Sequence, residues 1–373
     1  MQTYQTFTPP IRTLMGPGPS DVSPRVLNAM CRPTLGHLDP MFIQLMDDTK
    51  ALLQYAFQTE NALTMPISAP GSAAMEACFV NLVEPGDTVV VCINGVFGTR
   101  MVENVERCGG KAIKVEDTWG TQTTPEKLED ALRSNPEAKF VAFVHAETST
   151  GVRNDAKLLC EIAQQYNCYT IVDAVTSLAG IEIDVDGWGI DAIYSGSQKC
   201  LSCVPGIAPV SFSDKAVELI QNRKTKVQSW FLDMNLIVGY WGKGGKRAYH
   251  HTAPVNTVYA LYESLVMLQE EGLQNSWERH NATHKKLASG LAELGLEFAV
   301  EEHCRLPQLN AVRIPDGIDD AQVRSTLLND YNLEIGAGLG ALAGKVWRIG
   351  LMGHGCTDKN VDYCLSSLKK VLK

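Results

Sequence analysis

Between about Leu52 and Val210, short apolar runs rich in β-branched residues alternate with amphipathic helical patterns. The strand-like runs are Asp87–Asn94, Lys111–Glu116, Phe140–Ala146, Thr170–Asp173 and Ala192–Ser195, and helical stretches such as Pro125–Arg133 and Asp155–Tyr166 separate them. This alternation predicts an α/β fold, in which a mostly parallel sheet carries helices on both faces. Ligands of such sheets bind beyond the carboxyl ends of the strands, so we look for functional residues there.

The pattern changes after this region. Residues Thr257–Gly290 predict one long amphipathic helix that bridges two domains. Further on, Leu309–Ile314 and Lys345–Leu351 have strand patterns, whereas Asp320–Tyr331 and Asp358–Val371 have helical ones, which favours a smaller α+β domain. We therefore predict an N-terminal arm (residues 1–15), a large domain (16–271) and a small C-terminal domain (272–373).

Charge and composition restrict the partners and the compartment. The 33 Lys and Arg against 42 Asp and Glu leave a net charge of −9, which disfavours nonspecific binding to nucleic acid or to an anionic membrane. No apolar run approaches the roughly 20 residues that span a bilayer, and Met1 to Met15 lack the apolar core of a signal peptide. The 11 cysteines are odd in number and scattered through predicted strands and helices, which favours reduced thiols over disulfides. We expect a cytoplasmic protein.

Two charged side chains end neighbouring apolar strands. Lys199 closes the segment Tyr194-Ser-Gly-Ser-Gln-Lys199, and Asp173 ends the strand that begins at Tyr169. An imine-forming lysine and a carboxylate that faces a pyridine nitrogen are what pyridoxal phosphate (PLP) requires of a protein. Displaced from the cofactor, the Lys199 amine would be a base for proton transfer at the substrate Cα. Asp173 taken alone could equally be a helix cap or an ion-pair partner.

Three further segments reach the same edge of the sheet in chain order. The turn at Gly71 and Ser72 opens a helix and offers N–H groups to an anion, although an ordinary Ser-capped helix is the favoured explanation when the turn is taken alone. Phe97, on a Gly-flanked loop, could stack on a flat ring or fill the core. Thr148 belongs to a hydroxyl cluster that could bond the ring oxygen or cap a helix.

These motifs resemble the class V aminotransferases of the type I PLP fold, and among them the alanine–glyoxylate and serine–pyruvate aminotransferase group. The similarity is colinear over nearly the whole chain, from Leu14–Ser20 through Asn94–Arg100 to Gly344–Gly350. It implies a seven-stranded, mostly parallel sheet, a smaller α+β domain and a homodimer with shared active sites. The implied activity is ping-pong transfer of an amino group from alanine or serine to glyoxylate or pyruvate.

The resemblance also implies a role for each matching residue. Lys199 would be the imine lysine, Asp173 the partner of the pyridine nitrogen, Val175 a contact of the ring face and Thr148 a partner near the ring oxygen. Gly71, Ser72 and Gln198 would hold the phosphate, and Tyr249 and Thr252 would reach the phosphate site of the neighbouring subunit. Phe97 stands where the family often has a tryptophan, and Pro70 where some relatives have a serine. Arg348 would bind the substrate carboxylate, for which a planar guanidinium is well suited.

Alternatives remain open at this stage. Ureidoglycine, aminoethylphosphonate or aspartate could be the donor instead, because specificity between small substrates depends on about 1–3 kcal/mol of contacts. A noncatalytic PLP-fold binding protein is a less favoured possibility. A relaxed dinucleotide motif at Gly338–Ala343 precedes a strand pattern rather than a helix, so a nicotinamide enzyme is disfavoured.

Other short patterns receive no function. His280 and His284 are spaced for one helix face, which we interpret as solvated rather than as a metal site. Cys200 and Cys203 form a lone CxxC, which we interpret as coincidence, although a redox role stays open. The segment Gly242–Arg247 lacks the spacing of a nucleotide-binding loop and is expected to be a mobile loop.

Overall fold

The computed structural model describes residues 2–242 and 247–372, so the centre of the expected loop Gly242–Arg247 lies outside the described residues. The main sheet has seven strands, in the spatial order β2 (Leu63–Ile67), β10 (Ala208–Phe212), β9 (Ala192–Tyr194), β8 (Tyr169–Asp173), β5 (Ala138–Val144), β3 (Thr88–Ile93) and β4 (Lys111–Glu116). Neighbours from β9 to β4 pair in parallel, whereas β10 is antiparallel to both β9 and β2. The predicted α/β class with a mostly parallel, seven-stranded sheet is confirmed.

The composition of the strands follows their place in the sheet. The central strand β3, with the sequence Thr-Val-Val-Val-Cys-Ile, is buried at every position, as a strand covered on both faces must be. Its neighbour β4 is an edge strand and exposes Lys111 and Lys114. Charged side chains on an edge strand discourage pairing with another chain, so β4 ends the sheet.

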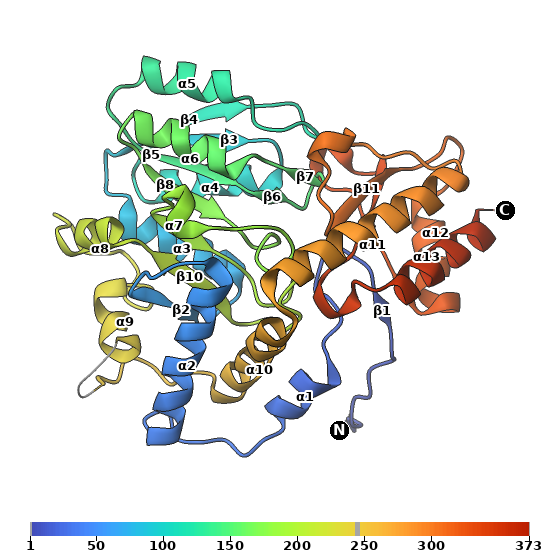
Figure 1. Cartoon of the computed structure of the whole chain (residues 1–373), viewed down its shortest axis with the longest axis horizontal. Helices are drawn as coiled ribbons and strands as arrows, with labels where there is room; N and C mark the ends of the chain where they lie inside the picture. The colour runs from blue at the N-terminus through green and yellow to red at the C-terminus, as the bar shows by residue number, and fades with distance from the viewer. Residues whose placement is uncertain (1, 243–246, 373) are drawn as a thin grey trace.

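Helices surround the sheet in the left-hand part of Figure 1. They are α1 (Pro24–Met30), α2 (Pro40–Phe57), α3 (Gly71–Leu82), α4 (Val96–Arg107), α5 (Pro125–Ser134), α6 (Ala156–Gln165), α7 (Val185–Trp188), α8 (Asp214–Gln221), α9 (Met234–Trp241) and α10 (Val255–Glu271). A short hairpin of β6 (Ala146–Glu147) and β7 (Val152–Arg153) follows β5 at the carboxyl end of the sheet.

The C-terminal part lies beside the main sheet and its helices, at the right of Figure 1. An antiparallel sheet of β11 (Leu309–Arg313), β14 (Val346–Gly350) and β13 (Gly336–Ala337) packs with helices α11 (Leu273–Glu293), α12 (Asp320–Tyr331) and α13 (Asp358–Val371). Its buried core, which includes Leu327, Trp347 and Leu368, is separate from the core around the main sheet. The domain boundaries at residues 15 and 271 stay a prediction.

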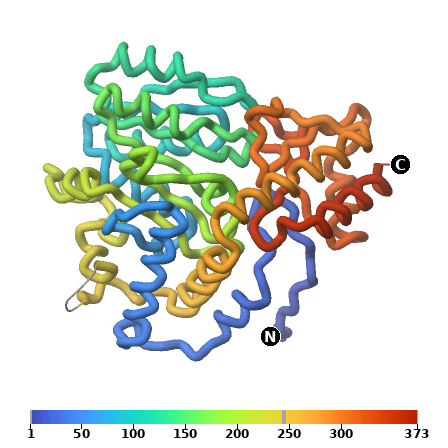
Figure 2. The backbone as a smooth tube through the Cα atoms, viewed as in Figure 1, coloured from blue at the N-terminus to red at the C-terminus, as the bar shows by residue number. Residues whose placement is uncertain are grey.

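The N-terminal segment joins the C-terminal part. Strand β1 (Thr13–Leu14) pairs in parallel with β12 (Leu333–Glu334), so the first residues run alongside the last third of the chain (Figure 2). The main-chain N–H of Gly350 donates to the carbonyl oxygen of Met15 at 2.7 Å, which extends this contact to β14. The residues after Met15 are thereby directed toward the carboxyl edge of the main sheet.

Two local predictions are wrong. The single helix over Thr257–Gly290 is two helices, α10 and α11, because Gly272 between them has φ +84°, a left-handed conformation that ends a helix. His280 and His284 do not face solvent: both are buried, His280 within hydrogen-bond distance of Ser276 O and His284 of Asn310 Oδ1. Among the described residues, no helix combines the length and apolar character of a membrane span.

Candidate active site

The parallel register brings Asp173 and Tyr194 side by side at the carboxyl edge of the sheet. Val144 of β5 is level with Asp173 of β8, and Asp173 is level with Tyr194 of β9. Asp173 is buried, its Oδ1 accepts the N–H of Val175 at 2.8 Å, and its Oδ2 accepts the Tyr194 hydroxyl at 2.9 Å. Burial raises the pKa of Asp173 to about 7, against the lowering effect of these two donors. A carboxyl group with such a pKa exchanges a proton readily near neutral pH.

Lys199 lies in the turn that follows β9 and is nearly buried. Its ammonium group donates to the carbonyl oxygen of Pro17, and its own carbonyl oxygen accepts the Ser20 hydroxyl at 2.7 Å. Burial lowers the pKa of Lys199 to about 8, and the positive charge of Arg348 acts in the same direction. Since only the neutral amine attacks a carbonyl carbon, this environment prepares the lysine for covalent chemistry near neutral pH.

The N-terminal segment contributes a residue that our sequence reasoning gave no role. Gly18 has φ +102°, and a Cβ added to it would lie only 2.6 Å from Lys199 Nζ. The backbone of Pro17 and Gly18 therefore packs directly against the lysine. The Gly-Pro-Gly-Pro sequence was the available signal, because glycine between prolines marks a turn that other residues adopt with strain.

We expect Gly18→Ala to slow the binding of PLP to the apoprotein by about tenfold to a hundredfold. The left-handed backbone costs an alanine about 1–3 kcal/mol, and its methyl group displaces the lysine. Stopped-flow absorbance after addition of PLP measures the rate. Gly86→Ala is the matched control, because Gly86 has φ +89° but an added Cβ there meets nothing within 4 Å. Equal effects of the two variants would contradict a specific contact with Lys199.

The residues predicted to hold a phosphate gather around the start of α3. The N-cap residue is Pro70 and makes no side-chain cap, so the reading of an ordinary Ser-capped helix is wrong. A Cβ at Gly71 would lie 3.3 Å from Val175 Cγ2 and 3.4 Å from the carbonyl oxygen of Ser195. The first N–H groups of a helix have no intrahelical acceptor, so an anion binds there without competition.

Gln198 borders the same space. Its Oε1 is buried without a hydrogen-bond partner in the described residues, and a Cβ at Gly196 would lie 3.0 Å from that atom and 3.3 Å from Val175 Cγ1. An amide rotated by half a turn presents its N–H₂ instead, which is a donor for phosphate. Gly71 and Gly196 thus both lie against Val175, and Gln198 lies against Gly196, so the predicted phosphate-binding residues are close to one another at the start of α3.

Phe97 and Thr148 occupy neighbouring elements. Phe97 lies in the first turn of α4, not in a loop as predicted, and the guanidinium of Arg100 lies 4.9 Å from its ring centroid. Thr148 is buried in the β6–β7 hairpin, where its carbonyl oxygen accepts a hydrogen bond from Arg348 Nη1 at 3.2 Å. Phe97 thus lies against Arg100 of its own helix and Thr148 against Arg348, and their roles in ring stacking and in hydrogen bonding to the ring oxygen stay predictions.

Arg348 is a buried cation on the central strand β14 of the small sheet. Besides Thr148, its guanidinium donates through Nε to the carbonyl oxygen of Ala337 at 2.6 Å. Within residues 2–242 and 247–372, no carboxylate forms an ion pair with it. Burial lowers the pKa of Arg348 to about 10, although the charge of Glu147 opposes this. A buried guanidinium without an ion-pair partner is a good receptor for an external carboxylate.

Tyr249 and Thr252, unlike the buried residues described so far, lie on the surface of the subunit. The side chain of Tyr249 is 59% exposed, its hydroxyl lies 3.3 Å from Thr252 Oγ1, and its ring lies 4.9 Å from that of His37. His251 between them contacts Ser68 Oγ at 2.7 Å, close to the start of α3. These contacts leave both residues accessible to a second molecule.

One buried residue of the site was missed altogether. Glu147 of β6 is fully buried, and its Oε2 accepts the main-chain N–H of Phe97 at 3.1 Å. Its negative charge raises the pKa of Asp173 and favours the charged form of Arg348. The sequence offered only a charged residue in a strand-end segment, and its burial depends on α4, which comes from another part of the chain.

The site combines a buried lysine of lowered pKa, a buried carboxyl group beside Tyr194 and an open helix N-terminus. It also holds a buried arginine that has no ion-pair partner in the described residues. Together these groups define a PLP-dependent enzyme that acts on carboxylate substrates. The chain belongs to the aminotransferase class-V family, whose model matches residues 23–362. Aminotransferases of this class use PLP, and the donors described above suit that cofactor.

Individual relatives cover nearly the whole chain. It is 41% identical over 366 residues to the alanine–glyoxylate aminotransferase of Rattus norvegicus. This alignment covers 98% of the present chain and 88% of the relative. The crystal structure of an alanine–glyoxylate aminotransferase from Nostoc sp. superposes with a TM-score of 0.97 at 46% identity, covering 100% of this chain and 98% of the other. A ureidoglycine–glyoxylate aminotransferase from Bacillus subtilis gives 0.96 at 38% identity, over 99% and 94%. The type I PLP fold is confirmed.

Proposed function

We propose that this protein is a transaminase that moves an amino group from alanine or serine to glyoxylate or pyruvate. The observation that supports it best is the buried Arg348, which has no ion-pair partner in the described residues and donates one hydrogen bond to the carbonyl oxygen of Thr148 in the β6–β7 hairpin. Both substrates of such a reaction carry a carboxylate. The similarity to alanine–glyoxylate aminotransferases over 98% of the chain or more supports the choice of donor and acceptor.

PLP, when bound, supplies an electrophilic carbon and a ring that accepts the electrons released at the substrate Cα. Gly71, Ser72 and Gln198 would bind its phosphate, Val175 and Phe97 would contact the ring, and Thr148 would bond the ring oxygen. Asp173 would hold a proton at the pyridine nitrogen, and the Tyr194 hydroxyl, 2.9 Å from Asp173 Oδ2, keeps that carboxyl group in place.

Lys199 has two roles in this proposal. Its Nζ would hold the cofactor, and the amine, when free, would be the base that takes the proton from the substrate Cα and moves it within the site. Arg348 binds the substrate carboxylate and fixes which bond at Cα faces Lys199. The second half of the cycle uses the same groups in reverse with the 2-oxo acid, which yields ping-pong kinetics.

We also propose a homodimer in which Tyr249 and Thr252 reach the phosphate site of the second subunit. Their exposure, and the contact of His251 with Ser68 beside α3, support this arrangement. Light scattering that finds a monomer at catalytic concentration would contradict it. The 11 free thiols further support the proposal of a reducing, cytoplasmic compartment, which fractionation of the native cells would test.

The visible absorbance of the PLP-loaded protein tests the reaction. Alanine or serine is expected to bleach the band of the bound cofactor, and glyoxylate is expected to restore it, because each half-reaction changes the chemical state of the cofactor. Aspartate, aminoethylphosphonate and ureidoglycine are titrated in parallel. Faster bleaching by ureidoglycine would replace the proposed donor, and a band that no amine changes would favour a noncatalytic binding protein.

A further inference from the structure

Glu147 links the β6–β7 hairpin to the start of α4. Besides the N–H of Phe97, its carboxylate accepts the main-chain N–H of Ser149 at 3.0 Å and the Ser149 hydroxyl at 2.6 Å. Ser149 Oγ in turn accepts the N–H of Val96 at 2.9 Å. The N-cap residue of α4 is Gly95, which has no side chain to offer, so Glu147 and Ser149 provide the acceptors for the first turn of this helix.

The side chains of Glu147 and Ser149 leave no space for a side chain at position 95. A Cβ at Gly95 would lie 2.3 Å from Cδ of Glu147 and 2.5 Å from Ser149 Oγ, so the carboxylate fills the position in which a usual N-cap side chain would stand. Both carboxylate oxygens accept main-chain N–H groups. Only the ionised form has two acceptor oxygens free of hydrogen, so these bonds lower the pKa of Glu147, although burial is the larger effect and raises that pKa.

The two elements that Glu147 joins carry different parts of the site. Helix α4 presents Phe97, whose own N–H is bound, and the hairpin presents Thr148, whose carbonyl oxygen holds Arg348. A shift of the hairpin relative to α4 would therefore change the position of the stacking ring and of the carboxylate-binding guanidinium together.

We propose that Glu147 is a positioning residue, which sets the Phe97 ring and the Arg348 guanidinium at a fixed distance from each other by joining α4 to the hairpin. This inference rests on the proposed function, because it needs a cofactor ring next to Phe97 and a substrate carboxylate at Arg348. Glu147 itself touches neither ligand and acts through the N–H of Phe97 and through Ser149.

Glu147→Gln keeps the shape of the side chain but leaves one acceptor oxygen for two N–H donors. We expect it to weaken PLP binding about tenfold, in line with a lost hydrogen bond to a charged group. The visible circular dichroism of the bound cofactor should decrease, and KM for the amino donor and the 2-oxo acid should rise by a similar factor. Fluorescence titration with PLP measures the affinity.

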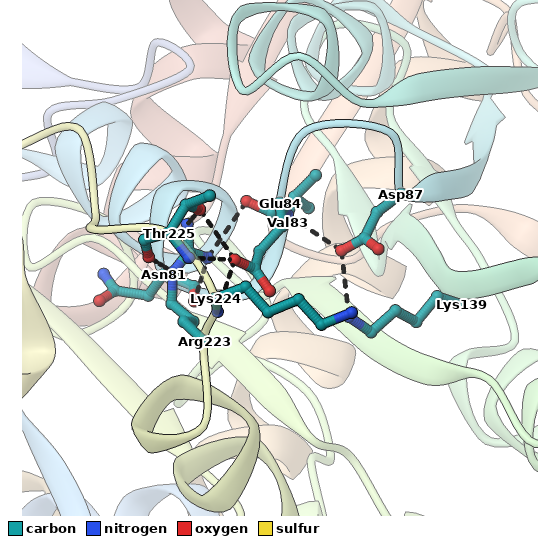
Figure 3. A network of polar contacts seen from close by, with 8 residues as sticks. All are labelled: Asn81, Val83, Glu84, Asp87, Lys139, Arg223, Lys224 and Thr225. Carbon is teal, nitrogen blue, oxygen red and sulfur yellow. Dashed lines mark hydrogen bonds and ion pairs between the residues drawn. The ribbon is translucent and has the colours of Figure 1, made fainter.

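Glu84→Gln is the matched control (Figure 3). Glu84 lies just beyond the C-terminal end of α3, and its Oε1 accepts the N–H groups of Lys224 and Thr225 at 3.0 and 2.8 Å, so it also caps main-chain donors. This variant should lower the melting temperature and leave the PLP affinity, the dichroism and both KM values unchanged. If Glu147→Gln behaves in the same way, the positioning role is wrong and Glu147 is a structural cap.

A second variant, Ser149→Ala, and assays without substrate complete the test. If Glu147→Gln does not fold, Ser149→Ala removes the acceptor of the Val96 N–H and should lower PLP affinity and dichroism to a smaller extent; an unchanged dichroism there would overturn the inference. Affinity and dichroism are measured without substrate. A wild type that binds PLP but transfers no amino group would refute the proposed function. The PLP affinity and dichroism of Glu147→Gln would still show whether Glu147 positions Phe97.

Discussion

Lys199→Ala is expected to lower kcat/KM for transamination by about 10³-fold or more. The variant loses both the covalent partner of the cofactor and the base that moves the substrate proton, and the second loss alone is worth about 10²–10⁴-fold. Steady-state assays with alanine and glyoxylate measure the change, and denaturing mass spectrometry after borohydride reduction shows whether PLP is still attached. The exposed Lys157→Ala serves as control. Retention of borohydride-fixed PLP in Lys199→Ala would show that another lysine carries the cofactor.

The environment of Lys199 adds a pH dependence to this prediction. Its pKa is lowered to about 8, so the amine is mostly protonated below that pH and mostly neutral above it. The rate of covalent PLP attachment to the apoprotein should therefore increase as the pH rises through about 8 and then level off. An exposed lysine with an ordinary pKa near 10.4 would still show a rising rate well above this range. A rate that keeps rising to pH 10 would contradict the effect of burial.

Asp173→Asn is expected to lower kcat by about 10²–10⁴-fold with a smaller change in KM. Asparagine keeps the shape and can still accept the N–H of Val175, but it cannot carry the negative charge that holds a proton on the pyridine nitrogen. The ring then accepts electrons from Cα poorly. The separate measurement of kcat and KM, together with PLP affinity, distinguishes this chemical loss from misfolding.

Asp191→Asn is the control for that variant. Asp191 lies just before β9, is buried, accepts the N–H of Thr170 at 3.1 Å and the Ser213 hydroxyl at 2.9 Å, and has a pKa raised by burial. It matches Asp173 in burial and hydrogen bonding, but it lies at the start of β9, whereas Asp173 lies at the end of the parallel strand β8 and so at the opposite edge of the sheet. Comparable losses of kcat in both variants would mean that burial, not the position next to the cofactor, explains the effect of Asp173→Asn.

Much of the fold could be predicted because the signals are local. The strand at Lys111–Glu116 and the helices at Asp320–Tyr331 and Asp358–Val371 have the predicted bounds, since their apolar periodicity is uninterrupted. The break at Gly272 was missed because the apolar pattern continues across it and only the backbone angle stops the helix. The burial of His280 was missed for another reason: its environment comes from residue 353, far along the chain.

The site shows the same division. Asp173 could be recognised because it ends an apolar strand, and Lys199 because it follows one; the parallel register then places Asp173 beside Tyr194, at the end of the strand that precedes Lys199. Pro17, Gly18 and Glu147 could not, because their contacts depend on where α4 and the N-terminal segment pack. Phe97 was expected in a loop, since two flanking glycines obscure the start of a helix whose N-terminal acceptors come from residues 147 and 149.

The pairing of β1 with β12 also bears on biosynthesis. Thr13 and Met15 leave the ribosome early, but their main-chain hydrogen-bonding partners are available only when residues 332 to 350 have been translated. Folding with such long sequence separation is slow, because the chain must close a large loop before the contacts form. The surroundings of Lys199, which include Pro17 and Arg348, are therefore complete only after β14 has been translated.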